Sequence, residues 1–326
     1  MKIRDYALIV AVAAALALVP LVVTSSTVLN FLVFTLLIAL AAQGWNVLGG
    51  YGGQFSFGHA AFFGTGAYAT AILQTRYGVN AWAGFAIGIA LGALVGWIIG
   101  FLTFRTGLKG SYFALVTLAF AEVLRVLANS FALTGGGAGV LIKLDVRPEN
   151  FQFASRAIFY WIALALVIVA MLISRRVETT RFGAQLAAVR ENEAAAQALG
   201  VDPFWVKMHA ITLSAGITAA AGAFYAQYFL FLDSGIAYGA WISVEALLAP
   251  IIGGLGTVFG PLLGALVLHG LGELAKYLGG AATGINLAVY GALLILAVAF
   301  LPNGVAGLLG RFRKPAPLPE ARRAEG

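Results

Sequence analysis

Long apolar runs separated by short polar connections make up most of this 326-residue chain. The runs are about 20 residues long, the length that a helix needs to cross a bilayer and about twice that of a barrel strand. The pattern predicts an all-α polytopic integral membrane bundle of about 8–10 transmembrane helices. The candidate spans are residues 6–24, 28–48, 59–74, 82–104, 112–130, 157–174, 204–231, 236–252, 261–278 and 285–301.

Three of these runs leave the number of crossings open. Runs 59–74 and 236–252 are short, and either could be a half-helix, which would give eight or nine crossings. The first run follows Lys2 and Arg4, like a secretory signal, but it continues to Val23 without a clear cleavage site. We therefore expect it to be retained as the first span, with cleavage as the less favoured alternative.

The basic residues predict an orientation. If the N-terminus is cytoplasmic, 14 of the 20 lysines and arginines fall inside, as the positive-inside rule expects. Both termini then lie on the cytoplasmic side of the membrane. Residues 175–203 become a cytoplasmic insert and residues 131–156 a long external loop. A transmembrane domain would cover residues 1–310, followed by a cytoplasmic Pro-, Ala- and Arg-rich tail, 311–326, which we expect to be disordered.

Composition narrows the function. Only 10% of the residues are charged, against about 25% in soluble domains, and the chain has no cysteine, which excludes thiol catalysis and disulfides. The sequence has no phosphate-binding G-x-x-x-x-G-K-[ST] loop and no H-E-x-x-H motif. Its three histidines, His59, His209 and His269, lack metal-ligand spacing. We therefore expect a transporter or channel, without an enzyme site, cofactor or metal of its own.

One long charged segment, residues 175–203, interrupts the apolar pattern. Because charged side chains are costly in lipid, this segment must lie outside the bilayer. Phe182, Leu186 and Val189 recur on one face, which predicts one or two amphipathic surface helices. Gly200 suits a helix end and Asp202 the N-cap of the next helix. The segment is either a solvated surface helix or a docking surface for a soluble partner.

A glycine-rich stretch at residues 49–66, GGYGGQFSFGHAAFFGTG, breaks the early helical pattern. It carries the polar residues Gln54, Ser56 and His59. It is either a short cytoplasmic turn or a broken helix whose polar groups line a path through the bundle. A similar stretch at 253–264, GGLGTVFGPLLG, fits an internal duplication.

A stripe of glycines runs along the span at residues 82–104. Such spacing lets a neighbouring helix approach closely, but it does not identify the neighbour. The glycines of the stripe are Gly84, Gly88, Gly92, Gly96 and Gly100.

Two opposite charges lie inside the span at residues 112–130. Glu122 and Arg125 are three residues apart and therefore share a helix face. Because lone charges are expensive in lipid, we expect an ion pair that faces the protein interior. The pair is either structural or close to a polar substrate path.

Several motifs together resemble the LivM-type permease subunits of branched-chain amino acid ABC importers. They include GGYGGQFSFGHAAFFGTGAYATAIL at 49–73, LKGSYFALVTLAFAEVLRVL at 108–127 and LTGGGAG at 133–139. FGAQLAAVRENEAAAQALGVD at 182–202 and IIGGLGTVFGPLLGA at 251–265 extend the resemblance over nearly the whole chain except the tail. The resemblance implies a second (LivH-like) permease subunit, two cytoplasmic ATP-binding subunits that hold ATP and magnesium, and a periplasmic substrate-binding protein. It also implies that residues 1–310 form a permease domain in a bacterial inner (plasma) membrane and that the loop 131–156 is periplasmic.

The resemblance also implies an ATPase-coupling motif in the charged segment. Glu193, Ala194, Ala195 and Gly200 match the Glu-Ala-Ala…Gly motif of ABC import permeases. The glycine lies one residue later than in the usual spacing and the following Ile-x-Leu-Pro is absent, as expected of the branched-chain amino acid group.

We hypothesise that the amphipathic face of the charged segment docks on an ATPase subunit. Phe182, Leu186 and Val189 would form the buried part of that contact, with Arg190 and Glu193 at its rim. Motion would then pass through Pro203 directly into the next span.

Two other functions remain open from the sequence. A self-contained channel or secondary transporter, for urea or another small polar solute, would explain the polar groups at residues 54–59 and the Glu122–Arg125 pair. It would not explain the charged insert. A purely structural permease half would leave the path to its partner. The resemblance favours branched-chain or related hydrophobic amino acids as substrate, and related importers handle urea, short amides and other amino acids.

Overall fold

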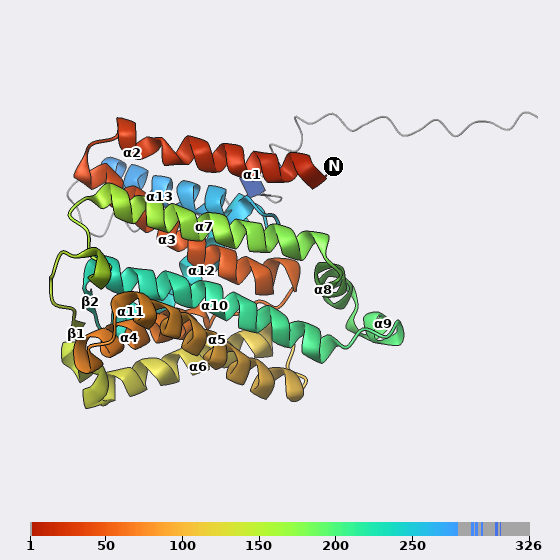
Figure 1. The fold of residues 1–326 in the computed structure, drawn as a ribbon. Helices are drawn as coiled ribbons and strands as arrows, with labels where there is room; N and C mark the ends of the chain where they lie inside the picture. The colour runs from red at the N-terminus through yellow and green to blue at the C-terminus, as the bar shows by residue number, and fades with distance from the viewer. Residues whose placement is uncertain are drawn as a thin grey trace, which may run out of the picture.

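The computed structural model describes residues 2–279 and eight isolated positions between 288 and 307. The last predicted span, residues 285–301, lies outside the described residues except for some of those positions, and the tail, 311–326, lies wholly outside them. The described part is an all-α bundle whose long helices run side by side (Figure 1).

The helices follow the predicted spans closely. Five helical segments in the described part are long and apolar enough to cross a membrane: Ser26–Tyr51, Ala81–Arg105, Gly110–Ser130, Arg156–Thr179 and Ser234–Gly253. The helices are α1 (Lys2–Ala17), α2 (Val19–Val22), α3 (Ser26–Trp45), α4 (His59–Tyr77), α5 (Ala81–Arg105), α6 (Gly110–Ser130), α7 (Arg156–Thr179), α8 (Arg181–Glu191), α9 (Glu193–Ala198), α10 (Pro203–Phe229), α11 (Ser234–Ala237), α12 (Ala240–Gly253) and α13 (Gly260–Gly279). Two-residue strands β1 (Val140–Leu141) and β2 (Phe231–Leu232), and a π-helical turn η1 (Asn46–Tyr51), complete the main elements.

Helix α10 is the centre of the bundle. It packs against α3, α4 and α5, and most of its length is buried. Its inner positions are small residues such as Ala215 and Ala219, both fully buried. Small side chains let helix backbones approach closely, which is how helices associate when lipid removes the usual hydrophobic driving force.

The glycine stripe of α5 faces α4 and α10 of the same chain. A β-carbon on Gly92 would collide with the side chain of Ala219, and one on Gly96 with that of Ala215. At the end of the stripe, a β-carbon on Gly84 would meet its nearest neighbour, the Thr70 carbonyl oxygen, at 3.5 Å. The stripe therefore belongs to the internal packing of this chain.

The two polar connections lie at opposite ends of the bundle (Figure 1). Helices α8 and α9 and the start of α1 lie at one end, which we call the α8–α9 end. At the other end, the strand end, β1 pairs antiparallel with β2, with Val140 opposite Leu232. This pairing ties the long loop, residues 131–156, to the end of α10. The charged segment and the long loop are thus separated by the length of the helices.

We expect the stripe glycines to differ sharply in their tolerance of a methyl group. Gly92→Ala and Gly96→Ala should each lower the thermal unfolding midpoint in detergent by several degrees, because overpacking a tight contact costs about 1–3 kcal/mol. Gly84→Ala is the matched control, since its new methyl group would have ordinary contact distances. Equal midpoints for all three variants would contradict the close approach of α5 to α10.

Candidate functional site

The charged segment forms two short helices, α8 and α9, joined at Asn192. Helix α8 ends at Asn192, whose side-chain oxygen accepts a hydrogen bond from the Ala195 backbone N–H (3.0 Å) and caps α9. Gly200 follows α9 in the left-handed region (φ +83°), where a side chain would be strained. Asp202 then caps α10, accepting from the backbone N–H of Phe204 at 3.0 Å. The sequence predicts the helix end at Gly200 and the cap by Asp202, but not the cap by Asn192.

The apolar face of α8 is already occupied by this chain. Leu186 is 1% exposed and Val189 4% exposed, and α8 packs against α7, α10 and η1. Phe182 is half-buried and meets His209 of α10 edge to face. The hypothesis that Leu186 and Val189 form the buried part of an ATPase contact is therefore wrong. Their periodicity reflects docking of α8 onto its own bundle.

The exposed surface of the segment lies on α9 instead. Ala194 and Ala195 are exposed, and Leu199, directly after α9, is 85% exposed. A large apolar side chain so open to solvent on a charged segment is a candidate contact for another protein. The sequence pattern missed Leu199 because it lies beyond the periodic face. Its position beside Gly200, at the helix end, is the signal that could have found it.

The Glu193 side chain, at the start of α9, forms ion pairs with one lysine of α10 and one lysine just before α6. Its carboxylate accepts from the ammonium of Lys207 on α10 (2.8 Å) and lies 2.8 Å from that of Lys109, which precedes α6. Lys207 is only 3% exposed, and its ammonium lies 5.2 Å from the Phe104 ring centroid. Burial alone would raise the pKa of Glu193, but the hydrogen bonds from the two lysines outweigh it and hold that pKa below its ordinary value. The Glu193 side chain is 25% exposed, so its predicted place at the rim of a partner contact stays a prediction beside this internal pairing.

Arg190 links α8 to the glycine-rich break. Its guanidinium donates to the Gly50 carbonyl (3.1 Å) and pairs with Glu191 at 2.9 Å. Gly53, in the left-handed region (φ +66°), lies against the methylene stem of Arg190. The arginine is partly exposed, with 42% of its side chain open, so it both faces solvent and holds the break.

The break consists of a π-helical turn followed by a non-helical segment. Helix α3 continues as the π-helical turn η1 and then gives way to a non-helical stretch, residues 52–58, before α4 begins at His59. Asn46 binds the second glycine-rich stretch, accepting from the Gly256 N–H (2.9 Å) and donating to the Thr257 carbonyl (3.0 Å). Gln43 donates to the Val258 carbonyl at 2.7 Å. The second glycine-rich stretch is therefore fastened to the end of α3 and the start of η1, directly before the first stretch.

Two of the three polar residues proposed for a path are enclosed by this chain. Ser56 and His59 are fully buried, and the His59 ring hydrogen-bonds Ser214 of α10 at 2.8 Å. Gln54 is half-buried and donates to the Gly52 carbonyl at 3.3 Å. The carbonyl that the break frees at Ser56 accepts from the indole of Trp45 at 2.7 Å. Their place on a path stays a prediction, while within the described residues Ser56 and His59 are enclosed.

Glu122 and Arg125 form the expected ion pair, at 2.6 Å, but on the outside of α6. The Glu122 side chain is 55% exposed and that of Arg125 37%. The opposite face of α6, with Phe113, Thr117 and Ala121, is the one that packs on the bundle. The prediction that the pair faces the interior of this chain is therefore wrong.

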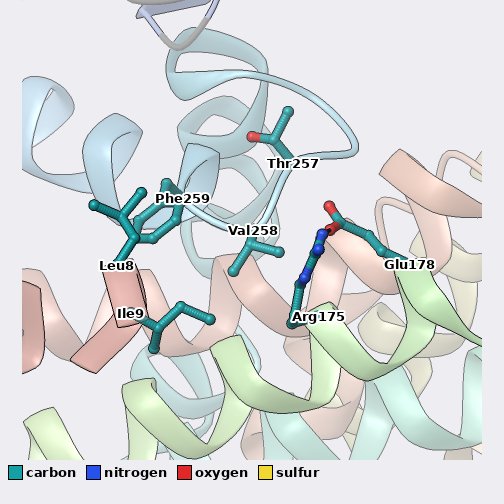
Figure 2. A pocket seen from close by; sticks show the side chains of 7 residues that line it. All are labelled: Leu8, Ile9, Arg175, Glu178, Thr257, Val258 and Phe259. Atoms are coloured by element: carbon teal, nitrogen blue, oxygen red, sulfur yellow. Dashed lines mark hydrogen bonds and ion pairs between the residues drawn. The ribbon is translucent and has the colours of Figure 1, made fainter. Parts of the chain in front are cut away.

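A cavity of about 210 Å³ opens between α1, α7 and the second glycine-rich stretch (Figure 2). The Arg175–Glu178 ion pair (2.6 Å) lies at one side, and Leu8, Ile9 and Phe259 lie at the other. Glu178 also accepts from the Tyr51 hydroxyl at 2.9 Å, so this cluster secures the end of η1 to α7. The described residues contain no group of three potential metal ligands.

Comparison with known proteins places this arrangement in a family. The family described as the permease component of the branched-chain amino acid transport system matches residues 27–298. The chain belongs to this permease family. No solved structure matches it significantly.

Individual relatives agree with the family. The permease protein LivM of the high-affinity branched-chain amino acid transport system of Escherichia coli is 28% identical over 88% of this chain and 71% of its own length. A probable LivM of Methanocaldococcus jannaschii is 28% identical over 76% of this chain and 77% of its own. The E. coli LivH permease is 26% identical over 82% of this chain and 91% of its own. The chain is thus similar to both kinds of permease named for that transport system.

We expect Glu193→Gln to destabilise this permease, because it leaves the buried Lys207 ammonium without a counter-charge. Breaking a buried pair in this way costs about 3 kcal/mol. The stabilisation is present above the ordinary carboxyl range and is lost as pH falls through the lowered pKa of Glu193. Denaturant titration in detergent at neutral and acidic pH measures both effects.

Lys109→Gln is the matched control for that experiment. Lys109 contacts the same carboxylate, but its side chain is 62% exposed, so its loss should cost at most about 1 kcal/mol. Equal losses for the two variants would show that Glu193 does not act through Lys207.

Proposed function

We propose that this chain is a transmembrane permease subunit of an ATP-driven importer of branched-chain or related hydrophobic amino acids. Separate ATPase subunits would supply the energy, and a periplasmic binding protein would deliver the substrate. The family supports the class of substrate. The observation that carries the energy coupling is the Glu193 junction, which ties an exposed surface helix to both α6 and α10.

The ATPase would bind the exposed surface of α9, through Ala194, Ala195 and Leu199. The exposed leucine would supply apolar contact area in a groove of the partner. The small alanine side chains would let the backbone of α9 come close to that groove. The α8–α9 end then lies in the cytoplasm, as the positive-inside rule predicts.

Movement of α9 would reach the bundle by three connections. Asp202 and Pro203 continue the chain directly into α10. Glu193 connects α9 to Lys109 at the start of α6 and to Lys207 inside α10. Arg190 connects α8 to the glycine-rich break through Gly50. A partner that binds α9 differently in two states would thereby shift all three elements, which is what coupling requires.

We expect Leu199→Asp to abolish binding of the ATPase subunits while the permease still folds, because the side chain makes little contact within this chain. Co-isolation through a tag on the permease measures the binding, and ATPase turnover measures the coupling. Leu144→Asp is the matched control: that leucine is 68% exposed in the loop 131–156, at the opposite end. Retained ATPase in the Leu199→Asp complex would contradict the docking surface.

Reconstitution tests the function as a whole. The complete complex in liposomes should accumulate radiolabelled leucine only with ATP and the binding protein, and the isolated permease should not transport it. Uptake by the isolated chain without ATP would instead support a self-contained channel or secondary transporter. Competition by unlabelled valine, isoleucine and urea would separate amino acid import from import of small amides.

A further inference from the structure

Helix α6 presents a broad apolar face that the described residues of this chain leave uncovered. Leu115 is 62% exposed, Leu118 38% and Val126 49%, and the Glu122–Arg125 pair lies among them. Their spacing of three, four and seven residues places them on one side of the helix. Helix α6 forms an outer edge of the bundle, on the side away from α1 (Figure 1).

The ion pair lies at the depth of the hydrocarbon. Glu122 is twelve residues from the start of α6 and eight from its end. At 1.5 Å a residue, these positions are about 18 Å and about 12 Å along the helix. A bilayer core is about 30 Å thick, so Glu122 lies near its middle.

Lipid is a poor cover for this face. Ionised side chains at such depth face protein or water rather than acyl chains, and the short stem of a glutamate cannot carry its carboxylate to the surface. Arg125 uses two of its five N–H donors on Glu122, at 2.8 and 2.6 Å. Within the described part of the chain, the structure gives the remaining donors no acceptor. Polar groups on the covering element would satisfy them.

The relatives, and the neutral, mainly apolar character of the face, indicate which protein covers it. The chain is similar to both LivM and LivH, two permeases named for one transport system. A permease of that kind is the partner that would meet α6 within the bilayer. A soluble ATPase or binding protein cannot reach this depth.

We propose that the α6 face formed by Leu115, Leu118, Glu122 and Val126 packs against the second permease chain, and that the Glu122–Arg125 pair is buried there with polar groups of that chain. This inference rests on the proposed function, since it needs a two-permease complex. Beyond the proposed function, it identifies α6 as the helix through which this chain contacts the second permease. Because Lys109 at the start of α6 contacts Glu193, the same helix connects the ATPase end to the contact between the permeases.

Photo-cross-linking tests the contact. A benzophenone amino acid replaces Leu118 on α6 or, as the matched control, Leu94 on α5, which is 51% exposed in the middle of its helix. The complex is isolated by a tag on this chain after irradiation of whole membranes, and adducts are identified by mass spectrometry. We expect an adduct with the second permease from Leu118, at least tenfold more abundant than from Leu94.

The outcomes separate the contact from the function. An intact complex with only lipid adducts at Leu118, with adducts to another copy of this chain, or with equal yields at both positions would overturn the contact alone. A tagged chain that isolates without a second permease or ATPase subunits would overturn the proposed function and the contact with it.

The role of the ion pair has its own control. Glu122→Ala should reduce co-isolation of the second permease at least tenfold, and the double variant Glu122→Arg with Arg125→Glu should restore part of it. Glu273→Ala is the matched control, because it removes an exposed pair of the same spacing, Glu273–Lys276 on α13. Equal co-isolation from the Glu122→Ala and Glu273→Ala complexes would contradict burial of the Glu122–Arg125 pair.

Discussion

A single buried ammonium group dictates how the polar segment joins the bundle. Lys207 lies on the most buried helix, with almost no exposed surface, and only Glu193 supplies its counter-charge among the described residues. A charge removed from water is tolerated only when it is paired and hydrogen-bonded. Helix α9 is therefore held at a fixed position over α10, and the same carboxylate reaches Lys109 at the start of α6. One ionic contact fixes the surface helix relative to two long ones.

This arrangement divides the charged segment into two surfaces with different tasks. The apolar side of α8, with Leu186 and Val189, is buried against the bundle. The alanines of α9 and the following Leu199 are exposed. Under the proposed function, α8 would anchor the segment to the bundle while α9 would contact the ATPase. Arg190 extends the connection to Gly50, where the α3 backbone leaves its regular winding.

The sequence was sufficient for features that depend on local chemistry. The apolar runs predicted the helices, the glycines predicted the break after Tyr51, and Asp202 predicted its own cap. The sequence did not show which protein each of these residues contacts. Periodicity says that Leu186 will be buried but does not say against which protein, and a charge pair on α6 reads the same whether this chain or another covers it. The pairing of Glu193 with Lys207 could not be predicted either, because the two residues are 14 positions apart and lie on different helices.

The side-chain amides of Gln43 and Asn46 have a further consequence for the bundle. They bind consecutive backbone groups of the loop between α12 and α13, so the end of α3 and that loop form one rigid unit. Helices that are far apart in the chain are thereby locked in register at their tips. Opening this end of the molecule would therefore have to move the early and late helices together, because these hydrogen bonds join them.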